Sequence, residues 1–234
     1  MPAQGGERAT AGRRQGRRRW LGLALAVLLL PAAADGPAFD TDTLRVIEQR
    51  YGAAAVQRVR DWRQLIDTEQ NQPLNVKLQA VNDFFNQLLF VDDIIHWKQS
   101  DYWATPVEFL GTAGGDCEDF AIAKYFTLRA AGIALDHLRL LYAKVLPGRM
   151  PHMVLAFYPT PHADPRILDN LTSRMKLLSQ RDDLDPVYAF NEARVWLFRD
   201  DGTPADVCAA GTIVLWRTLL ERVAQEEQPV GALA

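Results

Sequence analysis

The sequence predicts an α+β fold, with helices first along the chain and an antiparallel sheet after them. Between residues 40 and 89, apolar side chains recur every three or four residues, which is the spacing of amphipathic helices. After Gly132, short segments rich in β-branched, aromatic and leucine residues alternate with turns that contain proline or glycine, as strands do. Between these regions a nearly wholly apolar helix begins at Cys117, and we expect it to pack across the sheet.

Two helical regions open this pattern. The first begins after Asp40 and is expected to break at Gly52, and the second begins after Pro73. Their expected core positions are Leu44, Ile47, Val56, Val59, Trp62, Leu65 and Ile66 in the first region and Leu74, Leu78, Val81, Phe84, Phe85, Leu88 and Leu89 in the second. Residues 92–106 are rich in aromatic side chains but have no helical period, so they are expected to form a long loop.

The second half of the sequence is expected to supply the sheet and a closing helix. The expected strands are residues 138–145, 153–158, 166–168 and 187–198, and the helix is 212–225. No internal repeat or low-complexity linker divides the chain. Residues 35–234 are therefore expected to form a single domain.

Residues 1–34 have the layout of a secretory signal peptide. Five arginines between residues 13 and 19 lead into the ten apolar residues 21–30, and the small residues 32–34 offer a cleavage site after Ala34. The apolar segment is about half the length of a membrane-spanning helix. Export to the periplasm is the prediction. Removal of residues 1–34 would take away six arginines and one glutamate and lower the formal charge from −3 to −8. The mature chain would then have no basic patch with interleaved aromatic residues, which argues against nucleic acid as a partner.

The residues around Cys117 have the pattern of an activated nucleophile. Two glycines and Asp116, a favourable N-cap residue, come directly before Cys117, which then begins the apolar helix. Free amides and the helix dipole stabilise a thiolate at that position. Asp116, Glu118 and Asp119 oppose this effect because they surround the thiol with negative charge. They either cap the helix or bind a calcium ion, whose preferred ligands are carboxylate oxygens.

A cysteine nucleophile needs a base and a group that orients the base. Of the four histidines, His152 stands at the head of the most apolar strand, and Asp169 follows the next strand along the chain. A hairpin of these strands would bring the two side chains together. The remaining histidines are His96, His137 and His162.

These residues resemble the bacterial transglutaminase-like cysteine proteinase family. The resemblance is carried by residues 102–106, by residues 115–125 with their Asp-Cys-Glu-Asp core, and by the spacing to His152 and Asp169. It implies a papain- or transglutaminase-like cysteine proteinase fold. It also implies a cysteine protease whose catalytic triad is Cys117, His152 and Asp169.

The resemblance further implies a calcium-dependent enzyme. Asp116 and Glu118 correspond to calcium ligands, and Asp136 is a plausible third ligand at the next strand. When the Cys117 thiolate attacks a substrate carbonyl, an oxyanion forms. We expect the Cys117 backbone amide and a side-chain donor from the upstream loop to bind it, and Trp103 is the candidate for that donor.

The substrate and partner are implied by the resemblance as well. Members of this family cleave the N-terminal region of a large surface adhesin after a di-alanine and so release cells from a biofilm. The periplasmic domain of an inner-membrane receptor for cyclic di-GMP restrains them. A tryptophan exposed in residues 92–106 is a candidate for that contact.

Two other interpretations remain open on the sequence alone. A transglutaminase-type acyl transferase uses the same triad but passes the acyl group to an amine rather than to water. The second interpretation is a noncatalytic calcium-binding module. Its Cys117 and Cys208 would form a disulfide, because an exported protein with two cysteines often pairs them.

Overall fold

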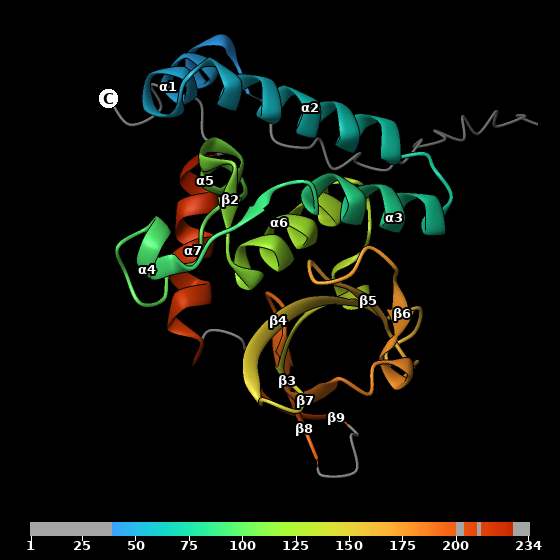
Figure 1. Ribbon diagram of the computed structural model, residues 1–234. Coiled ribbons are helices and arrows are strands. Elements are labelled where there is room, and N and C mark those ends of the chain that lie inside the picture. Colours follow the sequence, from blue (N-terminus) through green and yellow to red (C-terminus); the bar gives the residue numbers. More distant parts are fainter. Residues whose placement is uncertain (1–38, 200–203, 210–211, 227–234) are drawn as a thin grey trace, which may run out of the picture. The chain divides into compact units, whose positions relative to one another are not determined.

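The computed structural model describes residues 39–199, 204–209 and 212–226, drawn in colour in Figure 1. All of them belong to one compact unit that runs from Ala33 to Ala234. The predicted signal peptide, residues 1–34, lies outside the described residues. None of the described helices is both long and apolar enough to span a membrane.

The three N-terminal helices confirm the predicted helical regions, but Leu74 and Leu89, two of the expected core residues, are exposed. Helix α1 (Thr41–Tyr51) begins at Asp40, whose carboxylate accepts a hydrogen bond from the Thr43 amide at 2.7 Å. Gly52, with a φ of 86°, separates α1 from α2 (Ala53–Glu69). Helix α3 (Leu74–Phe85) starts directly after Pro73. The buried residues Ile47, Val56, Trp62, Leu78 and Phe85 lie on the predicted apolar faces.

The prediction of one long loop over residues 92–106 was wrong. Strand β1 (Leu89–Phe90) precedes a short helix α4 (Asp93–His96), and helix α5 (Pro106–Thr112) follows a shorter loop. Thr105 and Glu108 form a capping box at the start of α5. That pair starts the helix without an apolar period, which is why periodicity missed it. Strand β2 (Gly114–Gly115) then pairs in parallel with β1.

Helix α6 (Cys117–Ala130) lies at the centre of the described unit. It contacts α3 and α5 on one side and strands β3 and β4 on the other (Figure 1). Gly132, with a φ of 89°, follows its end, and the Ile133 amide donates back to the Leu128 carbonyl at 2.9 Å. This is the glycine-terminated helix end that the sequence predicts.

In the part of the chain that the structure describes, the main sheet has seven antiparallel strands in the order β6-β5-β4-β3-β7-β8-β9. A 3-10 turn, η1 (Leu135–His137), leads into it, and a second, η2 (Leu178–Gln180), lies between β6 and β7. The strands are β3 (Leu138–Val145), β4 (Met150–Phe157), β5 (Arg166–Leu168), β6 (Lys176–Leu177), β7 (Leu184–Phe190), β8 (Arg194–Phe198) and β9 (Pro204–Ala209). The predicted strand 187–198 is therefore two strands, because the chain turns at Asn191, whose side chain accepts the amides of residues 193 and 194.

The sheet has an apolar core on each face. Side chains alternate along β3, so that Leu138 and Leu140 join the core beneath α6, whereas Leu141 and Ala143 join a second core on the opposite face. Helix α7 (Val214–Glu226), the predicted closing helix, buries Trp216 in the first core. The fold thus holds the start of α6 firmly against the sheet.

Candidate active site

Cys117 occupies the first position of α6, as predicted, and carries a free thiol. The disulfide to Cys208 is therefore not present. Asp116 is the N-cap residue, but its carboxylate does not cap the helix, so that part of the prediction was wrong. The Cys117 Sγ accepts the Met153 amide of β4 at 3.4 Å and donates to Glu118 at 2.9 Å. The thiol thus lies beside the strand that carries His152.

His152 and Asp169 meet as the hairpin argument predicts. Strands β4 and β5 pair antiparallel, and the His152 Nε2 lies 2.8 Å from the Asp169 Oδ1. Both side chains are buried. Because Nε2 is engaged by the carboxylate, Nδ1 is the ring nitrogen left for proton exchange with a substrate or a thiol.

Arg181 is a third member of this group that sequence reasoning missed. It follows η2, is buried, and donates to the Asp169 Oδ2 at 2.8 Å and to Asp183 at 2.7 Å. Burial alone would raise the pKa of Asp169, but the hydrogen bonds from His152, Leu171 and Arg181 outweigh it and bring this pKa to about 2. Asp169 is therefore a carboxylate at neutral pH. No local pattern in the sequence marks Arg181, because only the fold brings it to Asp169.

Three carboxylates, of which Asp93 and Asp119 are buried and Asp116 is half-buried, lie together beside the nucleophile. Asp93, Asp116 and Asp119 each offer an oxygen within 4.8 Å of the other two. One oxygen of each is buried and has no hydrogen-bond partner. Burial, together with the neighbouring negative charges, raises the pKa of Asp93 to about 6 and raises the pKa values of Asp116 and Asp119. Unpaired buried oxygens of this kind are the arrangement expected of a cation site.

The predicted metal ligands divide between different places. Asp116 belongs to the group just described, and Glu118 belongs to a second group with Asp93 and Asp101. Asp136 belongs to neither group. It lies on η1, beyond the far end of α6, and the 14 residues of that helix rise by about 20 Å. Asp119, one of the carboxylates that the sequence offers to calcium, and Asp93, which the sequence analysis did not single out, lie with Asp116 instead.

The same carboxylates act on the thiol. Burial, and then the charges of Glu118 and Asp116, raise the pKa of Cys117 well above its usual range, and the Met153 amide only partly opposes this. This is the repulsion that the sequence predicts. A bound cation would offset it.

Trp103 is buried, and its ring stacks on Phe190 with centroids 5.7 Å apart. This packing in the core is a structural role for Trp103. Its role as an oxyanion donor stays a prediction. Trp97 is only half-buried. The exposed apolar side chains of this region are Ile94 and Ile95 rather than a tryptophan.

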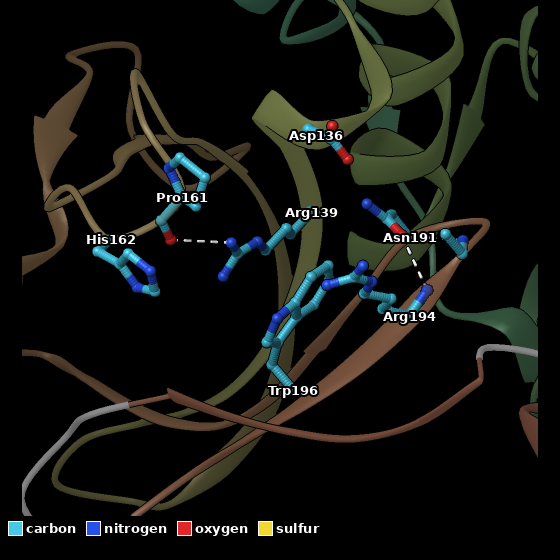
Figure 2. Close-up of a pocket in the computed structure, with 8 residues that line it drawn as sticks. Asp136, Arg139, Pro161, His162, Asn191, Arg194 and Trp196 are labelled. Atoms are coloured by element: carbon cyan, nitrogen blue, oxygen red, sulfur yellow. Dashed lines mark hydrogen bonds between the residues drawn. The ribbon is translucent and has the colours of Figure 1, made fainter.

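The other histidines serve elsewhere. The His137 Nδ1 contacts the Tyr158 carbonyl at 2.7 Å, and His96 packs on Trp97. His162 lines a cavity of about 400 Å³ with Asp136 and Trp196, where Arg139 donates to the Pro161 carbonyl at 3.0 Å (Figure 2). Neither Cys117 nor His152 lines that cavity.

Solved structures of a known protein are similar to this chain over most of its length. LapG of Legionella pneumophila in an EGTA-treated form is 41% identical, with a TM-score of 0.68 over 80% of this chain and 99% of that one. The calcium-bound form of the same LapG is 40% identical, with a TM-score of 0.67 over 79% of this chain and 99% of that one. No curated protein sequence matches. Residues 53–188 match the family described as bacterial transglutaminase-like cysteine proteinases, and the chain belongs to that family.

Proposed function

We propose that this protein is a calcium-dependent cysteine endopeptidase with Cys117, His152 and Asp169 as its catalytic triad. The observation that carries the proposal is the placement of the three residues. The Met153 amide holds the Cys117 Sγ beside β4, and the adjacent His152 is fixed by Asp169 at 2.8 Å. Family membership supports the reaction class.

Each residue then has a distinct chemical role. The Cys117 thiolate attacks the scissile carbonyl, and the Cys117 amide at the start of α6 meets the oxyanion. The His152 Nδ1 takes the proton of the Cys117 thiol and delivers it to the departing amine. It then takes a proton from the water that hydrolyses the acyl-enzyme and returns it to the Cys117 sulfur. Asp169 holds the imidazole through Nε2, so that Nδ1 faces the reaction.

The carboxylate group fits calcium. Asp93, Asp116 and Asp119 supply hard oxygen ligands, and each has a buried oxygen that no other group satisfies. Glu118 is a further candidate from the same turn. When bound, calcium supplies positive charge next to Cys117. The existence of calcium-bound and EGTA-treated forms of LapG supports this choice of metal.

We propose a large surface adhesin, cut near its N-terminus after a di-alanine, as the substrate, and a periplasmic site of action. This cut would release cells from a biofilm. Exposed apolar side chains near the triad support a polypeptide substrate: Phe90 pairs with Gly115, Met150 lies two residues before His152, and Leu171 lies two residues after Asp169. The family resemblance supplies the choice of adhesin, and it also supplies the restraining partner, the periplasmic domain of a cyclic di-GMP receptor.

The test is cleavage of an N-terminal fragment of the host's own adhesin by the mature protein, by Cys117→Ala and by Cys117→Ser, in calcium and in chelator. We expect two peptide ends, formed only with Cys117 and calcium. An amine adduct or a cross-link would instead establish the acyl transferase. Intact fragment under all conditions would refute the protease.

The metal ligands need a matched pair of variants. Asp119→Asn should lower calcium affinity by about tenfold or more, because it removes a charged ligand from a buried site. Asp136→Asn makes the same chemical change at the far end of α6 and should leave calcium affinity as in the wild type. Titration calorimetry with calcium decides, and equal losses in both variants would contradict the site.

A further inference from the structure

Lys124 is a buried cation that the mechanism above does not use. It lies on α6 seven residues after Cys117, which is about two helical turns, so it shares a face with the nucleophile. Its side chain is wholly inaccessible to solvent. A buried ammonium group is costly unless it is hydrogen-bonded. Its Nζ donates to the Asn86 Oδ1 at 2.7 Å.

Asn86 connects this cation to the proposed triad. It is the C-cap residue of α3, and its Nδ2 donates to the backbone carbonyl of Asp169 at 2.8 Å. An ammonium group has donors only, so it forces the amide oxygen of Asn86 toward itself. The amide nitrogen of Asn86 then has to face Asp169. Lys124 therefore sets the direction in which Asn86 donates.

The Asp169 backbone needs such support. Asp169 follows β5, which has only three residues, and residues 169–175 have no regular secondary structure. Side chains from helix α3 and its C-cap hold residues 169–173 at both ends. Asn86 binds the carbonyl of Asp169, and Gln79 and Asn82 donate to the carbonyl of Ser173 at 3.2 and 3.3 Å. Of these three side chains, only Asn86 acts on a member of the triad.

We propose that Lys124 is a positioning residue that acts through Asn86 to fix the peptide of Asp169 and thereby the carboxylate that orients His152. The inference rests on the proposed function, because it assumes that His152 acts with Cys117. Burial lowers the pKa of Lys124 to about 7, while the carboxylates of Asp169 and Asp83 favour the charged form.

Two variants break the connection at different points. Lys124→Met keeps the buried volume but removes the donor. Asn86→Asp keeps an acceptor for Lys124 but has no N–H to give to the Asp169 carbonyl. The matched control is Lys77→Met, since Lys77 is also a buried lysine, but within the described residues its Nζ donates to the backbone carbonyls of Gln70 and Ala131 and to no side chain.

The measurements are made on the mature protein with calcium at neutral pH. They are the alkylation rate of Cys117 by iodoacetamide and the proton resonance of the His152 Nε2–H, which its hydrogen bond to Asp169 displaces downfield. Both variants should slow alkylation by about tenfold, because a misplaced imidazole loses part of its acid–base contribution, and should move or broaden the resonance. Lys77→Met should lower stability but leave both readouts unchanged.

The outcomes separate this inference from the proposed function. A folded Lys124→Met protein with the wild-type alkylation rate and resonance would overturn the role of Lys124. Equal effects from Lys77→Met would also overturn it, since they would mark a general loss of packing. If Lys124→Met does not fold, Asn86→Asp decides by the same criteria. Wild-type protein that alkylates readily but cuts no adhesin would refute the proposed function alone, and the resonance would still test Lys124.

Discussion

At the scale of single residues, Asp169 is the best-supported side chain of the candidate site. His152 and the Leu171 amide contact its Oδ1, and Arg181 contacts its Oδ2. These contacts outweigh the cost of burial and lower the pKa to about 2. A carboxylate whose pKa is lower in the folded protein than in the unfolded chain stabilises the fold above the unfolded pKa, and here that contribution is about 2 kcal/mol.

The first prediction concerns Arg181→Met. Loss of this partner of a buried carboxylate should lower the free energy of unfolding by about 3 kcal/mol at pH 7. The difference from wild type should narrow as the pH falls from about 4 towards 2, because the contribution of Asp169 fades below its unfolded pKa and is lost at its folded pKa of about 2. Urea unfolding in chelator at pH 7 and pH 3 measures this. Arg181→Lys, which keeps the charge, is the control, and a pH-independent difference would count against the prediction.

A second prediction concerns Gly115, directly before the N-cap. A Cβ atom at this position would lie 2.1 Å from the Asp119 Oδ2, closer than any real contact. Gly115→Ala should therefore displace that carboxylate and lower both calcium affinity and activity. Gly132→Ala, at a φ of 89° with open space around it, is the control and should cost about 1 kcal/mol of stability without changing calcium affinity. Unchanged calcium binding in Gly115→Ala would show that Asp119 is not a ligand.

At the scale of elements, α7 holds the loop in front of the carboxylate group. Arg222 donates to the Tyr102 hydroxyl, to Glu108 and to the Trp103 carbonyl. The next residue of that loop, Ala104, donates its amide to Asp119 at 2.7 Å. Thr105 contacts Glu226 at 2.7 Å, which ties a second point of the loop to α7. The last helix thus supports a candidate metal ligand more than one hundred residues earlier in the chain.

The third prediction tests that link. Arg222→Leu removes the closer of the two cations that contact the buried Glu108 and leaves Arg50 at 3.8 Å, so the free energy of unfolding should fall by about 3 kcal/mol. Calcium affinity should fall too, because the loop that fixes Asp119 loosens. Arg217→Leu, an exposed arginine of the same helix, should change neither quantity by more than about 0.5 kcal/mol. Calcium affinity that stays at the wild-type value in Arg222→Leu would disprove the coupling.

At the scale of the whole molecule, the carboxylate group makes stability depend on calcium and pH together. Burial and the nearby charges of Glu118 and Asp101 raise the pKa of Asp93 to about 6, against the effect of the Tyr102 amide. In chelator the folded protein retains protons that the unfolded chain releases near pH 4. The folded state then binds more protons, so stability falls as the pH rises from about 4 to 6.

The fourth prediction follows from this linkage. The gain in melting temperature on adding calcium should be larger at pH 7.5 than at pH 5, because calcium replaces those protons. Calorimetry at both pH values measures the gain, and titrations in two buffers of different ionisation enthalpy measure proton release. Asp136→Asn serves as the control and should behave as the wild type. A gain that is equal or larger at pH 5 would exclude these carboxylates as the linked groups.

Several local features of this protein follow from the sequence alone. Helices α1, α2, α3 and α7, strands β3 and β5, and the N-terminal position of Cys117 on α6 are predicted correctly, because periodicity and capping are properties of neighbouring residues. The pairing of His152 with Asp169 was also predictable, since a hairpin joins strands that are adjacent in the sequence.

Other features depend on tertiary structure. Asp93 and Arg181 reach their partners from separate elements, and no local pattern records which elements will meet. Asp136 is the opposite case. It is close to α6 in the sequence, but it lies beyond the end of that helix that is farther from Cys117. Sequence patterns determine which residues can do the chemistry. Which of them meet is decided by packing, because burial and charge act between atoms that only the fold brings together.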